Sequence, residues 1–346
     1  MSTAAAHSRD AADADATASP LPLLRFQFVS DVHVEHRADP RAWPAVRRAA
    51  GVDTLVVAGD LGRVSGPGYR AFLGRLCGEF ARVLLVPGNH EHYQPARGPA
   101  LTVSGTIDAL RAMAAELPGL TVLHGDEAVV GGVRFLGTTL WSHVPDEHRA
   151  AVGAALNDYR SVFVARPDGA RRPGERRRRK DDGWTRATVA DTNAWHAEQL
   201  AWLEDAIGRT PRSSCNPAPA PVVVVTHHAP TPAHVAPRYA RQASRGLGHA
   251  FYTDVTRLVR HPVVCWVSGH THSSCSMRVG DDGVLCVANC AGYPAERVCG
   301  YDPGRVVAVY GGAPRPEAAY GGALRPEAAY GGRAEEEGCP DGFAPV

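Results

Sequence analysis

Three observations predict an α/β fold for this chain of 346 residues. Short runs rich in Val and Leu alternate along the sequence with longer stretches whose apolar residues recur at the helical period. Several of the short runs are apolar throughout, which is typical of strands that are buried on both faces of a sheet. The length of the chain and its apolar fraction of 44% allow a sizeable core. We therefore expect sheets that are covered by helices.

Strands are expected where short apolar runs rich in β-branched residues are bounded by turn-forming residues. These runs are 25–29, 54–58, 83–86, 133–136, 222–226 and 263–268. The segments 277–279 and 284–288 flank Gly280 to Gly283 and are expected to pair as a hairpin. Helices are expected where apolar side chains form a stripe at helical spacing, over 72–80, 107–117, 200–207 and 251–259.

Charge and targeting signals exclude some classes of protein. The chain has 37 Lys and Arg against 36 Asp and Glu, so its net charge of +1 gives no overall attraction to nucleic acid or acidic membranes. No apolar run approaches the roughly 18–20 residues of a membrane span, and the first residues do not resemble a secretory signal. The eight Cys include no C-x-x-C pair. We therefore expect an intracellular, cytoplasmic protein with reduced thiols and no membrane partner, in which Cys286 and Cys290 are unreactive packing residues.

Composition divides the chain into a predicted single domain and three polar segments. Residues 1–23 are expected to be a disordered leader, 24–309 the domain, and 310–346 a tail in which a ten-residue pattern beginning Tyr-Gly-Gly repeats. An Arg-rich loop is inserted at about 166–183. We interpret its basic run, 171–180, as a solvated loop, with nuclear targeting or a nucleic-acid contact as the alternative.

Polar side chains follow five of the predicted strands. The segments that carry them are Ser30-Asp31-Val32-His33, Gly59-Asp60, Gly88-Asn89-His90-Glu91, Thr226-His227-His228 and Gly269-His270-Thr271-His272. In α/β sheets the carboxyl ends of the strands meet at one crevice, so side chains distant in sequence can meet there. The glycines before these residues allow turns that β-branched residues would resist.

The chemistry of this set points to metal ions. Asp carboxylates, imidazoles and an Asn amide oxygen suit Mn, Fe or Zn in an open catalytic site better than a structural zinc site, which is rich in Cys. Seven such donors are too many for one four-coordinate ion, but they fit two ions that share a bridging carboxylate. Two metals held in this way can clamp a phosphoryl group and supply a hydroxide for in-line attack.

The chain resembles the calcineurin-like metallophosphoesterase superfamily. The blocks D-x-H, G-D, G-N-H-[ED], a single H and G-H-x-H occur in the order of that family, and the resemblance spans about 24–309. It implies a four-layer α/β/β/α sandwich with a dinuclear metal centre. It further implies that Asp60 bridges the two metals and takes part in catalysis, and that His90 contacts the phosphate and acts as general acid. The remaining ligands would be Asp31, His33 and His272 for one metal and Asn89, His227 and His270 for the other.

Departures from related patterns narrow the class. The protein Ser/Thr phosphatases have a second Asp where this chain has Arg63, and an Arg where it has Pro87, so that branch is excluded from the prediction. A less defined branch has Asn-Pro-Arg-Gly-Tyr near its end. Here Cys290 and Ala291 replace the Pro and Arg between Asn289 and Gly292, which removes a phosphate contact from that Arg.

Other residues have two interpretations each. His143 and His228 lie close to the motifs and could line the pocket, and Trp141 and Tyr293 either contact substrate or pack in the core. Nine further histidines are expected to be surface or packed imidazoles; they are His7, His36, His92, His124, His148, His196, His234, His249 and His261.

The predicted function is hydrolysis of a small phosphomonoester or phosphodiester by attack of a metal-bound hydroxide at a dinuclear centre. One alternative is a non-catalytic scaffold of the same fold, although such scaffolds have lost ligands and here every ligand position is filled. Another alternative is a nuclease of the same superfamily, for which the Arg-rich loop is the basic surface on offer.

Overall fold

The computed structural model describes residues 21–95, 100–165, 183–209, 212–213, 216–235, 246–296, 298 and 300–311. Most of the predicted leader, the Arg-rich loop and the tail lie outside these residues, so the predicted domain limits and the interpretations of the loop stay predictions. Among the described residues, no helix is both long and apolar enough to cross a membrane.

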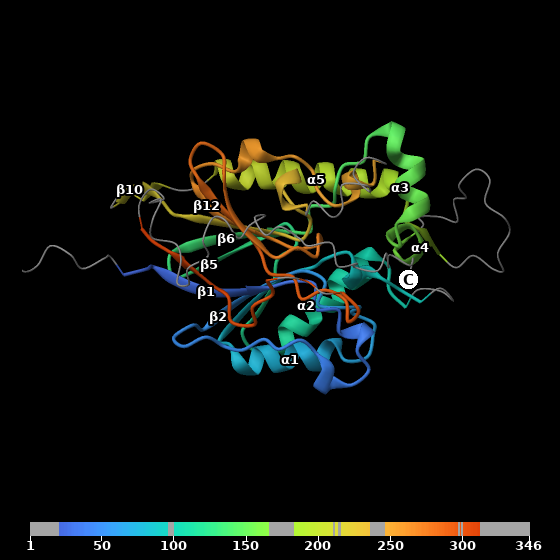
Figure 1. Cartoon of the computed structure of the whole chain (residues 1–346), viewed down its shortest axis with the longest axis horizontal. Coiled ribbons are helices and arrows are strands. Elements are labelled where there is room, and N and C mark those ends of the chain that lie inside the picture. The colour runs from blue at the N-terminus through green and yellow to red at the C-terminus, as the bar shows by residue number, and fades with distance from the viewer. Residues whose placement is uncertain are drawn as a thin grey trace, which may run out of the picture.

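Two sheets pack face to face, and helices cover the outer face of each (Figure 1). Helices α1 (Tyr69–Glu79) and α2 (Val103–Glu116) cover the five-stranded sheet, and α5 (Val189–Gly208) covers the six-stranded sheet. These four layers confirm the predicted α/β/β/α architecture.

The strands in the middle of both sheets are parallel. The five-stranded sheet has the order β15 (Val306–Val309), β1 (Leu24–Val29), β2 (Thr54–Ala58), β3 (Arg82–Val86) and β4 (Leu120–Val122), with β15 alone antiparallel. The six-stranded sheet has the order β13 (Cys275–Val279), β14 (Val284–Ala288), β12 (Val263–Ser268), β11 (Val222–Thr226), β6 (Val133–Thr138) and β5 (Asp126–Val130), with both edge strands antiparallel. In register, Phe28 lies beside Val56, and Val224 beside Leu136.

Every predicted strand is present, and the predicted hairpin is β13 and β14. The sequence did not predict several short elements. They are β4, β5, β15, β7 (Phe163–Ala165), β8 (Trp184–Arg186), β9 (Arg212–Ser213), β10 (Asn216–Pro219), α3 (Arg149–Ala155), α4 (Asp158–Ser161) and the 3-10 helices η1 (Val34–His36), η2 (Pro40–Ala42), η3 (His90–His92), η4 (Asp146–His148), η6 (Pro232–His234), η8 (Leu247–Ala250) and η9 (Thr256–Leu258).

The helix predicted over 251–259 is wrong. The backbone there pairs with the loop after β11, because the N–H groups of Thr253 and Val255 donate to the carbonyls of Ala229 and Pro230. The Asp254 side chain accepts hydrogen bonds from the backbone N–H and hydroxyl of Thr256 and so favours a turn. The apolar stripe is still buried, since Val255, Leu258 and Val259 pack under the six-stranded sheet.

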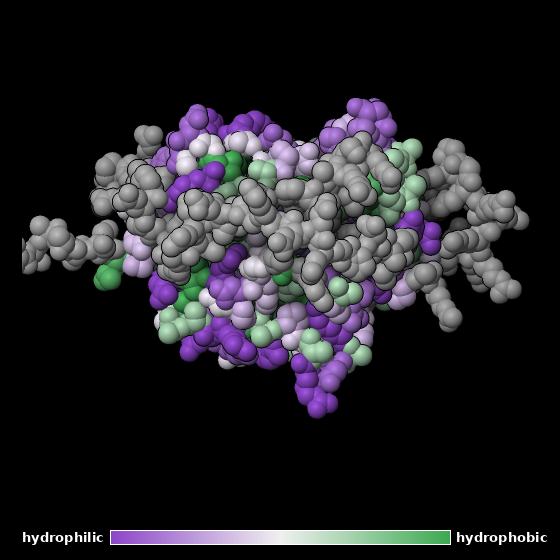
Figure 2. Space-filling model, in the orientation of Figure 1, coloured by the Kyte–Doolittle hydropathy of each residue, from purple (hydrophilic) through white to green (hydrophobic). Residues whose placement is uncertain are grey.

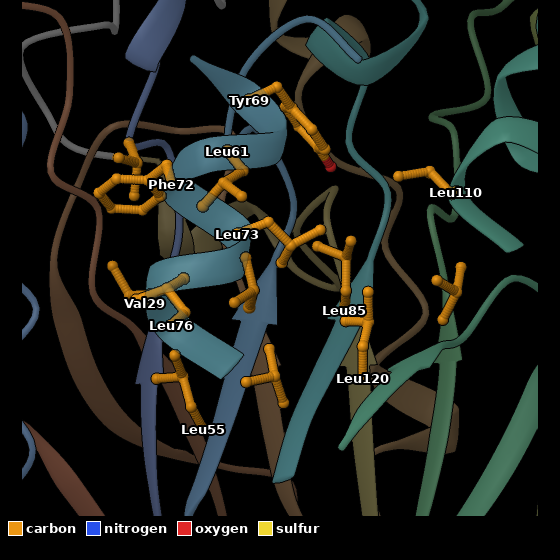
Figure 3. Packing of buried hydrophobic residues seen from close by; sticks show 14 of the residues in the cluster. Val29, Leu55, Leu61, Tyr69, Phe72, Leu73, Leu76, Leu85, Leu110 and Leu120 are labelled. Carbon is orange, nitrogen blue, oxygen red and sulfur yellow. The ribbon is translucent and has the colours of Figure 1, made fainter. Parts of the chain in front are cut away.

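Apolar side chains fill the three spaces between the four layers. Between the sheets, the rings of Phe26 and Phe135 meet edge to face with centroids 5.3 Å apart. Under the five-stranded sheet, Figure 3 shows Phe72, Leu73 and Leu76 of α1 lying against the strands. Truncation of such side chains to Ala costs on the order of 3–5 kcal/mol, so the sheets are held rigidly relative to one another.

The outer surface is more polar. On the face seen in Figure 2, hydrophilic side chains cover most of the visible upper and lower edges, and apolar side chains appear in small areas among them. Five cysteines among the described residues are free, and burial raises the pKa of the Cys286 and Cys290 thiols well above their usual value. This agrees with the prediction that both are unreactive packing residues.

One buried histidine leads to a prediction about acid stability. His234 is fully buried, and its Nδ1 lies 3.0 Å from the Ser268 hydroxyl. Burial lowers its pKa from 6.5 to about 4. Because the folded-state pKa is the lower one, the stabilisation is fully present above pH 6.5 and is lost as the pH falls toward 4. With metal removed from both proteins, we expect wild type to lose about 2 kcal/mol more unfolding free energy than His234→Asn between about pH 7 and pH 4.5 in urea titrations. Equal losses in the two proteins would contradict this.

Candidate metal centre

The polar residues that follow the central strands meet at one place in the structure. Asp31 follows β1, Asp60 follows β2, Asn89 follows β3, His227 follows β11, and His270 follows β12. All seven predicted ligands are at most 7% exposed; they are Asp31, His33, Asp60, Asn89, His227, His270 and His272. The geometry thus brings together side chains that are scattered over most of the chain.

Asp31, His33 and His272 form the first group. The Nε2 atoms of His33 and His272 are 3.0 Å apart, and His272 Nε2 is 3.4 Å from Asp31 Oδ1. The Nδ1 atom of His272 donates to the Glu296 carboxylate, so its Nε2 faces the group. One ligand atom from each of these residues could reach a single metal ion.

Asp60, Asn89, His227 and His270 form the second group. His227 Nδ1 donates to the Ala58 carbonyl at 2.9 Å, which leaves Nε2 facing Asn89 Oδ1 at 2.9 Å and Asp60 Oδ1 at 3.3 Å. The Asn89 amide nitrogen donates to Asp158, so the amide oxygen is the atom that faces inward. When His227 Nε2 carries no proton, three acceptor atoms converge here, and a cation between them would satisfy all three.

Asp60 lies between the two groups. Its Oδ1 atom is near His227 of the second group, and its Oδ2 atom is 3.8 Å from His33 Nε2 of the first. The donor set is made of carboxylate, imidazole and amide groups, with no thiolate among the residues that face it in the described structure. Such a set fits two borderline or hard cations that share one carboxylate.

The backbone of five predicted ligands is in the left-handed region, which is rare for non-Gly residues. The φ angles are 55° for Asp31, 50° for His33, 54° for Asp60, 65° for His270 and 46° for His272. Each such residue costs on the order of 1–3 kcal/mol and persists only where its surroundings fix it. Here the loops fix one another, because Asp31 N–H donates to Gly59 and His33 N–H to Asp60.

Two of the glycines predicted to allow turns have different roles. Gly59 has a φ of 83° and needs the left-handed region, and a Cβ there would also lie 2.4 Å from His227 Nδ1. Gly88 has an ordinary φ, but a Cβ there would lie 2.2 Å from Asp60 Oδ1. Gly88 is thus required because the loops after β2 and β3 approach each other closely, and not because of its backbone angles.

The charges in the two groups are strongly coupled. Burial acts to raise the pKa of the Asp60 carboxyl, but His227 and His90 outweigh it and hold that pKa well below its usual value. In turn, Asp60 outweighs burial and raises the pKa of His227 to about 9. Asp31 and Glu296 likewise raise the pKa of His272 to about 10. Protons on these imidazoles occupy the positions where cations fit, so metal binding is expected to release them.

His90 lies beside the two groups, and its contact with phosphate stays a prediction. Its ring stacks on Tyr93 with centroids 4.1 Å apart, and its Nε2 atom is 4.0 Å from Asp60 Oδ2 and 3.0 Å from the Tyr293 hydroxyl. Burial acts to lower the pKa of His90, but the carboxylates of Asp60 and Glu35 outweigh it and raise that pKa.

Four carboxylates that sequence reasoning did not single out hold this arrangement in place. Glu91 accepts from the backbone N–H groups of Asp60, Leu61 and Gly88, and so joins the loops after β2 and β3. The other three each contact a predicted site residue: Asp158 accepts from Asn89, Glu296 from His272, and Glu35 from His90. Two of them had a signal in the sequence: Glu91 stood inside the block Gly-Asn-His-Glu, and Asp158 inside Asn157-Asp158-Tyr159-Arg160, which resembles the less defined branch.

The four residues with two interpretations differ in their burial and in the rings that they contact. His228 is buried with its ring 4.1 Å from that of His270, and Trp141 is buried against Trp195, so Trp141 packs in the core. His143 is exposed. Tyr293 is half-buried, and its ring centroid is 4.3 Å from that of His33.

Nine other histidines were expected to be surface or packed imidazoles. Of those that the structure describes, only His36 lies in a group that could hold a metal, together with His33, Glu35 and His90. His92, His196 and His234 are buried, as expected for packed imidazoles, and His7 lies outside the described residues.

Asn289 donates to the backbone carbonyls of Phe28 and Asp302 and so ties the end of β14 to the strand β1.

Comparisons with known proteins identify the family and the fold. The family model for calcineurin-like phosphoesterases matches residues 24–274, which is more than half of the chain. An uncharacterised protein of Acanthamoeba polyphaga mimivirus is 22% identical over 285 residues, covering 78% of this chain and 92% of the viral protein. The solved structure of a phosphopantetheinyl hydrolase from Mycobacterium tuberculosis superposes with a TM-score of 0.55 at 20% identity, covering 78% of this chain and 89% of that one. At this identity the likeness shows a shared fold.

Proposed function

Since the chain belongs to the calcineurin-like phosphoesterase family, whose activity is hydrolysis of phosphoester bonds, we propose that it is a phosphohydrolase that depends on two metal ions. Asp31, His33 and His272 would hold one ion, Asn89, His227 and His270 would hold the other, and the Asp60 carboxylate faces both groups. The substrate is a small phosphomonoester or phosphodiester, and the ions are Mn, Fe or Zn.

The position of Asp60 carries this proposal. Its two oxygens face different groups, with His227 Nε2 3.3 Å from Oδ1 and His33 Nε2 3.8 Å from Oδ2. Burying carboxylates and imidazoles in one cluster is costly unless protons or cations lie between them, and a scaffold that binds no metal has no need of such a cluster. The left-handed backbone of five ligands adds further strain that a folding role alone does not explain.

Bound at these residues, two cations supply Lewis-acid chemistry, since they polarise phosphoryl oxygens and lower the pKa of water. The residues of the chain supply the rest. Tyr93 stacks on the His90 ring and fixes its plane. As the oxygen of a hydroxide ion bonds to phosphorus, the scissile P–O bond breaks and its electron pair goes to the leaving oxygen, which takes the Nε2 proton of the His90 imidazolium. Positioned general acids of this kind contribute on the order of 10²–10⁴ in rate.

Metal analysis tests the proposal. We expect the purified protein, after incubation with Mn²⁺, Fe²⁺ or Zn²⁺ and removal of excess ion, to retain close to two ions per chain. We also expect it to hydrolyse at least one member of a panel of phosphomonoesters and phosphodiesters, and to lose that activity with a chelator.

The outcomes separate the alternatives. No retained metal and no hydrolysis would support the scaffold, and two ions with no hydrolysis across the panel would show a metal site without the proposed activity. Activity confined to single-stranded DNA would favour a nuclease, and deletion of 171–180 would then be expected to reduce its dependence on salt.

A further inference from the structure

One carboxylate joins the predicted metal ligand His33 to the predicted general acid His90. Glu35 follows His33 by two residues in η1, and its side chain is 5% exposed. Its Oε1 atom lies 2.8 Å from His90 Nδ1, 3.5 Å from His33 Nδ1 and 3.7 Å from His36 Nε2. A single oxygen atom thus faces three imidazoles.

The consequence differs between His90 and His33, because His90 Nδ1 makes a hydrogen bond to Glu35 and His33 Nδ1, at 3.5 Å, makes none. Because a carboxylate only accepts hydrogen bonds, Nδ1 of His90 carries a proton where it meets Glu35. The opposite nitrogen of His90, Nε2, then faces the site at 4.0 Å from Asp60 Oδ2, and it carries a proton to donate when the ring is an imidazolium. A carboxylate behind an imidazole is a common way to fix both the tautomer and the direction of the ring.

We propose that Glu35 is a positioning residue that holds His90 Nε2 toward the leaving oxygen, and that the substrates are phosphate esters of aliphatic alcohols. The proposal rests on the proposed function. An aliphatic alkoxide is a strong base and leaves readily only when it receives a proton, whereas a nitrophenolate leaves without one. A protein that buries a carboxylate to orient a proton donor is therefore suited to phosphate esters whose leaving group is an aliphatic alkoxide.

The chain offers a matched control for Glu35. Glu296 also accepts from the Nδ1 atom of a site imidazole, but that imidazole is His272, which belongs to the first metal group. Loss of the Glu296 charge should weaken metal binding without changing which leaving groups are tolerated. Loss of the Glu35 charge should change the preference for leaving groups while two ions stay bound.

The experiment compares Glu35→Gln and Glu296→Gln, loaded with Zn²⁺, on an alkyl phosphate and on 4-nitrophenyl phosphate. For Glu35→Gln we expect kcat on the alkyl ester to fall on the order of 10²-fold and kcat on the nitrophenyl ester less than about threefold. Glu296→Gln should reduce both by the same factor. Equal losses on both esters in Glu35→Gln would overturn the proposal, whereas failure of wild type to hydrolyse any member of the panel of phosphomonoesters and phosphodiesters would instead refute the proposed function.

Two further measurements do not depend on activity. In nitrogen-15 NMR of the Zn²⁺-loaded wild type, His90 Nδ1 should carry a proton, and a bare Nδ1 would overturn the proposal even if the variants did not fold. The group of His33, Glu35, His36 and His90 could also hold an ion of its own. A metal count of three that falls to two in His36→Gln would assign Glu35 to that ion and overturn its positioning role, and a count of two in both proteins is expected.

Discussion

Asp60→Asn is expected to reduce hydrolysis of bis(4-nitrophenyl) phosphate by a factor on the order of 10³ or more. The Asp60 carboxylate lies near both metal groups, with one oxygen facing His227 and the other facing His33. Asparagine keeps the size of the side chain but removes the charge, and it turns an N–H₂ group toward one of the two groups. Neither ion is then held at its correct place.

The control for this variant is Asp53→Asn, whose carboxylate is 62% exposed and pairs with Arg48 on the surface. Its rate should equal that of wild type, because exposed ion pairs contribute little. The measurement is kcat at saturating Zn²⁺ or Mn²⁺, with metal content determined on the same samples. A rate for Asp60→Asn equal to that of wild type at full occupancy would count decisively against a shared carboxylate.

Apolar pattern predicted the central strands well, because buried parallel strands are apolar throughout. β2, β11 and β12 begin and end at the predicted residues. β4 has only three residues and no pattern of its own, and it becomes a strand because β3 pairs with it. The segment 251–259 shows the opposite error, since its stripe has the helical period while its backbone hydrogen bonds go to the loop after β11.

The predicted ligands all came together because each follows a strand, and parallel strands end at the same edge. Whether they bind metal stays a proposal. The residues that sequence reasoning missed sit one layer farther out and have no fixed spacing from the ligands. Asp158 reaches Asn89 across 69 positions, and Glu296 reaches His272 across 24. Such contacts depend on how loops fold back, which no local pattern specifies.

Gly88→Ala is expected to remove most activity although it replaces no ligand. A Cβ at residue 88 would lie 2.2 Å from Asp60 Oδ1, 2.6 Å from Asp60 N and 2.9 Å from His227 Cε1. None of these atoms can move cheaply, because Asp60 N–H is held by Glu91 and His227 by Ala58. Forcing the loops apart should cost about 3 kcal/mol of unfolding free energy. A shift of the ligands by about 1 Å should lower kcat on the order of 10²-fold.

The matched control is Gly78→Ala, since Gly78 lies in α1 and a Cβ there would meet nothing within 4 Å. That change should raise stability by about 0.5–1 kcal/mol, because Ala favours helix over Gly, and should leave the rate unchanged. Urea unfolding, metal content and kcat would be measured on both variants. If Gly88→Ala kept two ions and the wild-type rate, the loops after β2 and β3 could separate without cost. Their close approach would then not be what sets the distance between the metal ligands.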